Sequence, residues 1–418
     1  MDIRVKGNGV KGEVKILSSK SELHRLLIIS AFAKGKTRIE YYGEPSKDVL
    51  ATLSCIRGLG ATVIEEVGAF TVTPVEKITD EVAKICCGES GSTLRFILPV
   101  FSAVGKKLSI TVKGRLNERP LSPMYEILAK NGVVLSENGV YPLTVNGQFT
   151  GGNIEIKGDI SSQFISGILM ALPLTKNGGS VKVIGDFQSR PYVDITIDAM
   201  RKFGVTVTEK DGVFTVSGKY NSTGKVVASG DWSNATFFAC MGAIAGDITI
   251  SNLDKNSMQG DKKVMEILSS FGAKVEFSGD KLTVKKGELK GVNIDAKDIP
   301  DMVPALSIVA SVAKGETVIF NAERLRIKES DRIKAIKEMI NSIGGQVEEK
   351  SDGLIIKESK LKGGTVNGFN DHRIVMSACV SSLVTENAVT VLGANAVDKS
   401  YPQFFEIIKE LGFTAEEI

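Results

Sequence analysis

Runs of helical periodicity alternate with short strand patterns along the whole chain. Five runs place apolar residues three and four positions apart, which gives each run one buried helix face. Each run ends in a glycine, the residue that best fits the left-handed conformation after a helix end. The runs read SPMYEILAKNG, PYVDITIDAMRKFG, DKKVMEILSSFG, DRIKAIKEMINSIG and YPQFFEIIKELG. They predict five amphipathic helices, each stopped by a glycine.

A pair of strands is predicted after each stop, because apolar and polar residues alternate there around a turn that usually carries DG, NG or GD. The clearest pairs are ATVIEEVGAFTVTP, VTVTEKDGVFTVSG and AKVEFSGDKLTVKKG. The stop positions recur at intervals of 72, 72, 68, 72 and 68 residues. They are Gly60, Gly132, Gly204, Gly272, Gly344 and Gly412.

This period is longer than the units of solenoid proteins, so it indicates six α/β subunits rather than an array. A chain of 418 residues is also too long for one core, which favours two similar domains of three subunits each. The sixth copy, LGFTAEEI, stops at the last residue, and either MDIRV or EVKIL near the start would complete it. We therefore predict an α/β fold with one domain over 19–228 and the other over 1–18 plus 229–418.

Composition narrows the class of protein. A net charge of +3 is small for this length, which argues against a nucleic-acid coat but allows a local basic cleft. The N-terminal residues lack an apolar signal core, and no apolar stretch is long enough for a membrane span. Five cysteines, an odd number, suggest free thiols in a reducing compartment. A cytoplasmic protein is expected.

Cofactor motifs are absent or misplaced. Gly7–Gly12 matches G-x-G-x-x-G, but no full strand precedes it and no helix follows it, so we interpret it as a hairpin turn. The chain has two histidines, His24 and His372, and no cysteine pair has zinc spacing. We expect neither a metal nor a cofactor.

Three segments place small hydroxyl residues and glycine directly before an apolar helix. They are SSKSELHR from Ser18, GESGSTLR from Gly88 and SSQ from Ser161. Free backbone N–H groups and the helix dipole bind phosphate or carboxylate at such starts. Ser21 and Arg25 lie four residues apart and can contact the same anion. The simpler alternative is that these residues only cap helices.

Charge is concentrated in short motifs beside proline-bounded turns, and all but one of these motifs lie in the second half of the chain. A run such as RIKESDR is commonly a solvated helix face. At the starts of successive subunit helices, however, such groups can converge at one end of the sheets. The motifs are NERP, DIPD, RIKESDR, NDHR and DKSYP.

Taken in order, SKSELHR, GESGSTLRF, NERP, SSQF, SRPY, IPD, RIKESDR, NDHR and DKSYP resemble the motif series of the 5-enolpyruvylshikimate-3-phosphate synthase family. The resemblance runs from residue 20 to residue 402. It implies the enolpyruvyl transferase fold of two domains with three α/β units each, an inside-out α/β barrel. It also implies transfer of a carboxyvinyl group from phosphoenolpyruvate to the 5-hydroxyl of shikimate 3-phosphate, through a tetrahedral intermediate and without a cofactor. The partners expected are these two small molecules only, and the chain is expected to act as a monomer.

The resemblance also implies site residues. Shikimate 3-phosphate would contact Lys20, Ser21, Arg25, Ser161, Ser162, Gln163, Ser189, Tyr192, Asp301 and Lys328. Phosphoenolpyruvate would contact Lys20, Gly91, Arg119, Gln163, Arg332, Arg373 and Lys399. The N-terminal domain is expected to lie mainly on the shikimate 3-phosphate side and the C-terminal domain mainly on the phosphoenolpyruvate side. The catalytic residues implied are Asp301, Glu329, Lys20 and His372.

The proposed proton transfers follow from this set. Asp301 would orient or deprotonate the acceptor hydroxyl, Glu329 would deliver a proton to the methylene carbon, and Lys399 or Lys328 would assist the departing oxygen. The sequence leaves open which acid acts in which half-reaction.

Some positions depart from the family pattern. Glu89 stands where Asn is usual, Ser92 where Thr is usual, and Arg324-Leu325 where Asn-Trp is typical. These changes bear on affinity and on inhibitor response more than on the reaction.

Two other functions compete with this one. An enolpyruvyl transferase acting on UDP-N-acetylglucosamine would read Lys-Asn-Ala at Lys20–Glu22 and carry a cysteine near Arg119, where this chain has none between Cys87 and Cys240. A non-catalytic module for RNA ends or polyanions would need exposed stacking aromatics, but aromatic residues make up only 6%.

Overall fold

The computed structural model describes residues 1–76 and 81–418. The described chain forms two compact units. Unit 1 comprises Met1–Leu17, Gly43–Ser46 and Ser229–Ile418, and unit 2 comprises Ser18–Tyr42 and Lys47–Ala228. Within the described residues, no helix is long and apolar enough to cross a membrane.

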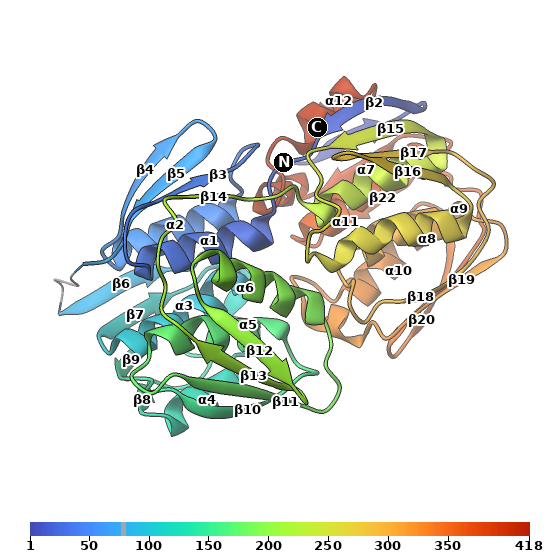
Figure 1. Ribbon diagram of the computed structural model, residues 1–418. Helices are drawn as coiled ribbons and strands as arrows, with labels where there is room; N and C mark the ends of the chain where they lie inside the picture. The colour runs from blue at the N-terminus through green and yellow to red at the C-terminus, as the bar shows by residue number, and fades with distance from the viewer. Residues whose placement is uncertain (77–80) are drawn as a thin grey trace. The chain divides into compact units, whose positions relative to one another are not determined.

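Unit 2 contains three four-stranded sheets with one common plan (Figure 1). The first two strands of each are parallel, and the other two join antiparallel. The sheets are β14 (Lys225–Val227), β3 (Thr37–Glu40), β5 (Ala69–Thr73), β4 (Thr62–Glu66); β6 (Val82–Cys86), β7 (Lys107–Thr111), β9 (Leu143–Gly147), β8 (Val133–Leu135); and β10 (Gly152–Lys157), β11 (Gly179–Ile184), β13 (Val213–Ser217), β12 (Thr206–Lys210).

Unit 1 repeats this plan in three further sheets. They are β2 (Val10–Lys15), β15 (Gly246–Ser251), β17 (Lys281–Lys285), β16 (Lys274–Ser278); β18 (Asn293–Asp295), β19 (Glu316–Phe320), β21 (Gly353–Lys357), β20 (Gln346–Lys350); and β22 (Gly364–Asn367), β23 (Val389–Leu392), β1 (Ile3–Lys6), β24 (Thr414–Glu417). Six sheets of one design confirm the predicted six subunits.

Along the chain, a buried helix follows the first strand of each sheet. In four sheets of the described chain this helix connects the strand to its parallel neighbour, as parallel pairing requires a crossover, whereas the helices after β2 and β14 lead to a strand of a different sheet. The buried helices are α1 (Lys20–Phe32), α3 (Gly91–Val104) and α5 (Ser162–Ala171) in unit 2, and α7 (Trp232–Ala245), α9 (Val303–Val312) and α11 (His372–Ser381) in unit 1. Nearly every residue of these six helices is buried. A helix that is apolar all round belongs in a core, so helices fill the inside of each unit and sheets lie outside.

In the described chain, a second set of six helices is amphipathic, and five of them lead into hairpins, whereas the last leads into β24, which pairs with β1. These helices are α2 (Lys47–Gly58), α4 (Met124–Lys130), α6 (Arg190–Lys202), α8 (Val264–Phe271), α10 (Arg332–Ser342) and α12 (Phe404–Glu410). All six repeat glycines after them have positive φ, between 80° and 108°. The predicted left-handed helix stops are therefore confirmed.

A second residue with a left-handed backbone recurs in every sheet. It lies within three residues after the second strand in the order given above. It falls at Gly43, Gly114, Gly185, Asn252, Asn321 and Gly393, with φ between 55° and 86°. Short 3-10 helices follow three of these positions, at Gly114–Glu118, Glu323–Ile327 and Ala394–Lys399. The sequence repeat did not reveal this position because two of its members are Asn, which adopts the left-handed conformation more readily than most residues do.

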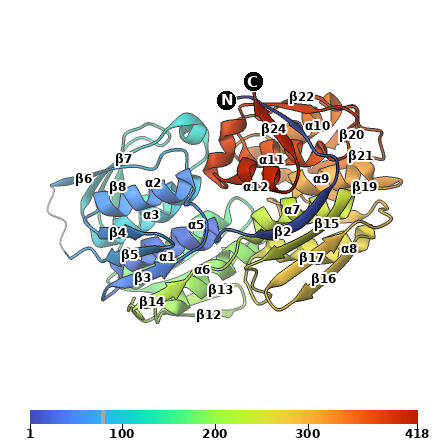
Figure 2. The same ribbon diagram turned by 90° about the horizontal axis from the view of Figure 1, so that it is seen from above.

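The N-terminal strands complete two different sheets. Strand β1 pairs with β24, so the MDIRV alternative for the sixth subunit is confirmed. Strand β2 instead pairs in parallel with β15, and the two lie side by side in Figure 2. The interpretation of Gly7–Gly12 as a hairpin turn is therefore wrong. The residues between β1 and β2 connect two different sheets, because each of these strands pairs with a strand that is far away in the sequence.

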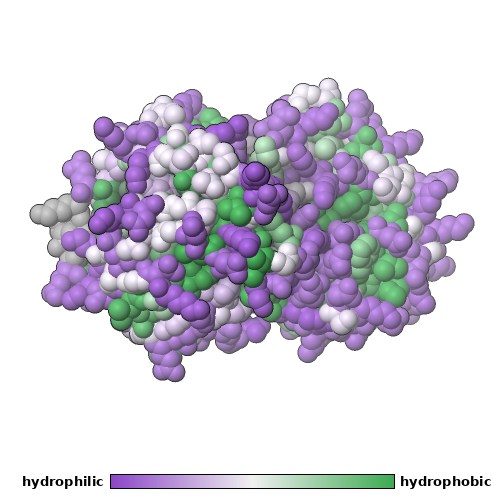
Figure 3. Space-filling view, turned by 60° about the horizontal axis from the view of Figure 1, so that its bottom comes forward, coloured by the Kyte–Doolittle hydropathy of each residue, from purple (hydrophilic) through white to green (hydrophobic). Residues whose placement is uncertain are grey.

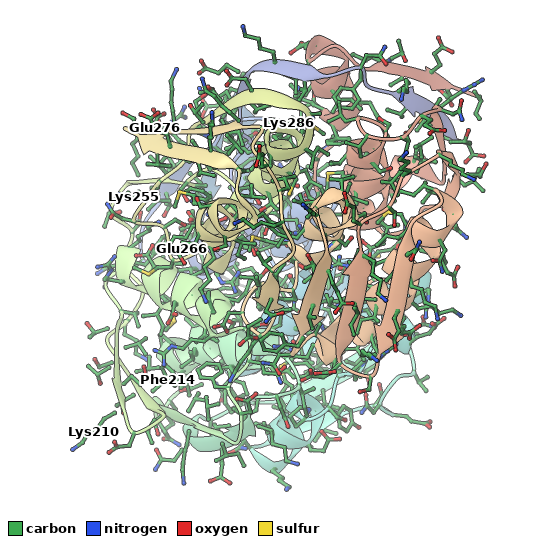
Figure 4. All side chains as sticks on the ribbon, turned by 90° about the vertical axis from the view of Figure 1, so that its right-hand side faces the viewer. Lys210, Phe214, Lys255, Glu266, Glu276 and Lys286 are labelled. Carbon is green, nitrogen blue, oxygen red and sulfur yellow. The ribbon has the colours of Figure 1, made fainter. Side chains whose placement is uncertain are left out.

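The face shown in Figure 3 is largely covered by hydrophilic residues. In Figure 3, apolar residues form separate green areas among purple and white ones. Exposed large apolar side chains belong to many elements, and include Tyr42, Val67, Val134 and Phe320. Figure 4 shows Lys210, at the end of β12, extending away from the ribbon, whereas Phe214 of β13 is fully buried.

Candidate active site

The start of α1 carries a buried guanidinium whose partners are neutral. Arg25 is 2% exposed, and its Nε and Nη2 donate to Thr196 Oγ1 at 2.6 Å and to the Tyr192 carbonyl at 2.9 Å. Its Nη1 donates to the Ser21 carbonyl at 2.6 Å. None of these partners is a carboxylate, and burial lowers the pKa of Arg25 to about 9. A buried cation held only by neutral oxygens is suited to an anionic ligand.

Lys20, the first residue of α1, pairs with a carboxylate of the next helix. Its Nζ lies 3.0 Å from Asp48 Oδ2, and both side chains are 15% exposed. Ser19 caps the helix through the Glu22 N–H. Ser90 and Ser161 cap α3 and α5 in the same way. The capping alternative thus holds for these three serines, while Ser21, Ser92 and Ser162 lie in the first turns.

Gly91 opens α3 against the guanidinium of Arg119. A Cβ added at Gly91 would lie 2.7 Å from Arg119 Nη1 and 3.1 Å from its Cζ. The absent side chain therefore leaves room for Arg119, which follows the 3-10 helix Gly114–Glu118. The two predicted donor-binding residues are neighbours in space.

Gln163, in the first turn of α5, is fixed by two side chains of α3. Arg95 Nη1 donates to Gln163 Oε1 at 2.6 Å, and Gln163 Nε2 donates to Ser92 Oγ at 2.8 Å. Arg95 Nη2 also donates to the Pro120 carbonyl at 2.9 Å, next to Arg119. Arg95 belongs to the GESGSTLR segment, but it is not among the site residues that the resemblance implies. It is 4% exposed and positions both Gln163 and the Arg119 segment.

Ser189 precedes α6 in a left-handed conformation, with φ of 53°. This backbone conformation is costly for serine and is commonly kept at functional sites. Ser189 is 2% exposed. Tyr192, one turn along, offers its carbonyl to Arg25, so the starts of α6 and α1 are held together.

Unit 1 gathers the charged residues of the second half around Arg332. Its Nε donates to Asp371 Oδ2 at 2.8 Å, its Nη1 to Asp301 Oδ1 at 2.8 Å, and its Nη2 to Glu329 Oε2 at 2.7 Å. Arg332 is 1% exposed. The neighbouring carboxylates, chiefly that of Asp371, raise its pKa against the opposing effect of burial. The guanidinium thus stays charged and orders three acids.

Asp301 is the meeting point of three cations. Besides Arg332, Arg373 Nη2 lies 3.1 Å from its Oδ2, and Lys328 Nζ lies 3.9 Å from its Oδ1. Burial lowers the pKa of Lys328 to about 8, although Asp301 and Glu329 act to raise it. These contacts bring together four of the residues predicted for unit 1.

Asp371 is a further residue that the sequence analysis did not assign to the site. It is fully buried, caps α11 through the Arg373 N–H at 3.0 Å, and accepts from Ser330 Oγ at 3.0 Å as well as from Arg332. Its place directly before a helix in the NDHR motif was the available signal.

The remaining predicted residues lie close to this cluster in sequence or space. His372 is the first residue of α11 and is 2% exposed. Lys399 Nζ donates to the Asn370 carbonyl at 2.8 Å, and Phe369 and Asn370 both have left-handed backbones. Among the described residues, no group of three or more His, Cys, Asp or Glu side chains is placed to hold a metal ion.

Comparison with known proteins assigns the family. A model for EPSP synthase (3-phosphoshikimate 1-carboxyvinyltransferase) matches residues 5–408. The chain belongs to the EPSP synthase family. A relative from Clostridium kluyveri named 3-phosphoshikimate 1-carboxyvinyltransferase is 40% identical, covering 98% of this chain and 96% of the relative. One of the same name from Methanocorpusculum labreanum is 37% identical, with all of both chains covered.

Solved structures agree. An EPSP synthase structure from Acinetobacter baumannii superposes with a TM-score of 0.82 at 26% identity and covers all of both chains. The enolpyruvyl transferase NikO from Streptomyces tendae shares the fold, with a TM-score of 0.79 at 16% identity over 99% and 98% of the chains. The predicted enolpyruvyl transferase fold and the EPSP synthase resemblance are confirmed, and the chain is a transferase.

Proposed function

We propose that this EPSP synthase family member transfers the enolpyruvyl group of phosphoenolpyruvate to the 5-hydroxyl of shikimate 3-phosphate, releasing phosphate, in aromatic amino acid biosynthesis. The full-length family match carries the proposal. Neither competing function is favoured by it. The polyanion module is further disfavoured because Trp232, the single tryptophan, is fully buried in the first turn of α7.

Acceptor binding is assigned first to the buried guanidinium of Arg25. Shikimate 3-phosphate brings a carboxylate and a phosphate, and charge-assisted hydrogen bonds to a desolvated Arg are strong. The starts of α1, α5 and α6 supply hydroxyls and backbone N–H groups. Lys328 and Asp301 are the acceptor residues proposed in unit 1. The proposed acceptor residues of unit 2 are Lys20, Ser21, Arg25, Ser161, Ser162, Gln163, Ser189 and Tyr192.

Binding of phosphoenolpyruvate is assigned mainly to arginine and lysine side chains that already contact other residues of the protein. Arg119 lies against Gly91, and the guanidinium of Arg373 is held in place by Asp301. Phosphoenolpyruvate would meet these residues together with Lys20, Gln163, Arg332 and Lys399. Arg332 is enclosed by three carboxylates, so its proposed contribution is chiefly to order Asp301 and Glu329.

Proton transfer is assigned to the acids around Arg332, assisted by Lys20 and His372. Addition moves the proton of the acceptor hydroxyl away and places one on the methylene carbon. Elimination then removes a proton from the new methyl group as phosphate leaves. Asp301, held by three cations, is assigned to orient the acceptor hydroxyl or accept its proton, and Glu329 is assigned to exchange the carbon-bound proton. Lys399 or Lys328 would stabilise the departing phosphate.

A phosphate-release assay tests the function. Phosphate should appear only when phosphoenolpyruvate and shikimate 3-phosphate are both present, and chelators should leave the rate unchanged. UDP-N-acetylglucosamine as the acceptor should give no release. Turnover with that sugar nucleotide alone would overturn the assignment.

We also propose a cellular location and an oligomeric state for the protein. All five cysteines are free thiols in the structure, which supports a reducing, cytoplasmic location. We infer a monomer, and light scattering after size-exclusion chromatography should give a mass near 44.8 kDa.

Replacing Gly91 with alanine should weaken donor binding. Because the new Cβ would approach Arg119 to 2.7 Å, the guanidinium must move away from its present place. The KM for phosphoenolpyruvate is expected to rise by about tenfold, which corresponds to roughly 1.4 kcal/mol. Glyphosate, proposed as an inhibitor that reaches the glycine Cα, should weaken more. Steady-state kinetics with both ligands measures this, and equal changes in the two constants would contradict it.

Acceptor affinity should fall as pH rises through about 8, the lowered pKa of Lys328. The protonated amine attracts the acceptor anion, so each pH unit above that value can cost up to about tenfold in affinity.

The stability of the fold should change with pH in the opposite direction. Since this pKa is lowered from 10.5 on folding, the unfolded chain binds more protons between the two values, and stability rises with pH there.

Calorimetric titration with shikimate 3-phosphate from pH 7 to 9 measures the affinity. The matched control is Lys328→Arg, which keeps its charge over this range. If Lys328→Arg shows the same pH profile as the wild type, the loss of acceptor affinity is due to another titrating group.

A further inference from the structure

Helices α1 and α2 of unit 2 are joined by two parallel polar contacts. Lys20 and His24 lie four residues apart on α1, and Asp48 and Thr52 lie four residues apart on α2. The first contact is the Lys20–Asp48 ion pair at 3.0 Å. The second joins His24 Nδ1 to Thr52 Oγ1 at 2.7 Å. His24 therefore shares a helix face with a proposed substrate ligand, without being one.

The second contact continues into α3. Thr52 Oγ1 lies 2.6 Å from Thr93 Oγ1, and the Thr93 hydroxyl donates to Ser90 Oγ at 2.7 Å. Ser90 is the residue that caps α3, accepting also from the Thr93 N–H at 3.2 Å. All four side chains are at most 1% exposed. We call His24, Thr52, Thr93 and Ser90 the α1–α3 relay.

The hydroxyl directions determine where the proton of His24 resides. Thr93 has one hydroxyl hydrogen and gives it to Ser90, so it must accept from Thr52. Thr52 then has no hydrogen left for His24 and must accept from Nδ1. Burial, with Lys20 and Arg25 nearby, lowers the pKa of His24 well below its usual value, so the ring is neutral. Its proton therefore lies on Nδ1, and Nε2, which has no hydrogen-bond partner among the described residues, carries the lone pair.

The far end of the relay lies at the proposed donor site. Gly91 follows Ser90 directly, and its Cα faces the Arg119 guanidinium with no room for a methyl group. A small shift of the α3 start would therefore change the contact between Gly91 and Arg119.

We propose that His24 is a positioning residue that, as the neutral Nδ1–H tautomer, fixes the start of α3 through the α1–α3 relay and thereby sets affinity for phosphoenolpyruvate. The role in donor binding rests on the proposed function, whereas the tautomer does not. It links the helix that carries Lys20 to the helix that begins at Gly91, without contact to either substrate.

Nitrogen NMR of the full chain labelled in its histidine rings tests the tautomer. The chain has two histidines, so two sets of ring signals are expected, and His24→Asn or His372→Asn identifies them. His24 should show a protonated Nδ1 and a bare Nε2, unchanged between pH 6 and 8. A ring protonated at Nε2, or at both nitrogens, would overturn the relay. This result does not depend on activity, so it separates the relay from the proposed function.

Kinetics of three variants test the positioning role. His24→Leu and Thr52→Val should each raise the KM for phosphoenolpyruvate by about tenfold, the effect of losing one buried hydrogen bond. The Kd for shikimate 3-phosphate should change by less than about twofold on the same scale. His24→Asn should recover most of the loss, because the Asn amide can donate where Nδ1 does.

The matched control is Thr236→Val in α7, which removes a fully buried threonine hydroxyl bonded to the Trp232 carbonyl. Its kinetic constants should equal those of the wild type. Equal weakening of both substrates by His24→Leu, or no recovery in His24→Asn, would make His24 a residue of stability only. If a variant fails to fold, the wild-type spectrum still decides the tautomer.

Discussion

Arg332→Met should lower the free energy of unfolding of unit 1 by about 3–5 kcal/mol, the cost of leaving buried charges without their partner. Arg332 is the common donor to Asp371, Asp301 and Glu329, and Asp371 is itself fully buried. Methionine has a similar length but no positive charge. The carboxylates would then repel one another or take up protons, and the order around Asp301 would be lost with them.

Urea denaturation followed by fluorescence of Trp232, which lies in unit 1, measures this effect. The matched control is Arg326→Met. Arg326 also bonds two carboxylates, Asp331 and Glu349, but its side chain is 29% exposed. Its loss should cost about 1 kcal/mol, the usual range for exposed pairs. Equal changes in the two variants would show that burial of the Arg332 cluster does not determine its contribution.

Arg25→Met should weaken binding of shikimate 3-phosphate by about a hundredfold, because charge-assisted hydrogen bonds to a buried guanidinium contribute roughly 1.5–3 kcal/mol. The loss of stability should be smaller than for Arg332→Met. The partners of Arg25 are neutral oxygens, so removing it leaves no buried carboxylate without a counter-charge. We therefore expect the Arg25 substitution to lower mainly the affinity for shikimate 3-phosphate, and the Arg332 substitution to lower mainly the free energy of unfolding.

Calorimetric titration without phosphoenolpyruvate measures this affinity apart from turnover. Arg57→Met in α2 is the control, because Arg57 is 41% exposed and pairs with Glu65 on the surface. Its acceptor affinity should match the wild type. Tight acceptor binding by Arg25→Met would remove Arg25 from the proposed site.

The site was predictable in part. The motifs at helix starts follow local rules of capping and charge, and their resemblance to the family's motif series implied Lys20, Gly91, Gln163 and Arg373 as site residues. The residues that contact these side chains could not be predicted from the sequence. Asp48, Asp371 and Arg95 reach Lys20, Arg332 and Gln163 from 28, 39 and 68 residues away in sequence. The position of Asp371 before a helix indicates a cap, but nothing in the local pattern of these three residues shows which distant side chain each one contacts.

The sequence by itself determined the repeat and its secondary structure. Helical periodicity, the left-handed glycines at helix ends and the hairpin turns all depend on contacts within about ten residues, so they can be recognised segment by segment. Tertiary structure decided which distant strands pair and which charges are neutralised. The choice of β1 over β2 for the last sheet, the inclusion of Gly43–Ser46 in unit 1, and the contrast between Arg25 and Arg332 depend on such distant contacts. Sequence spacing does not encode those contacts, because burial and pairing are set only once the whole unit has packed.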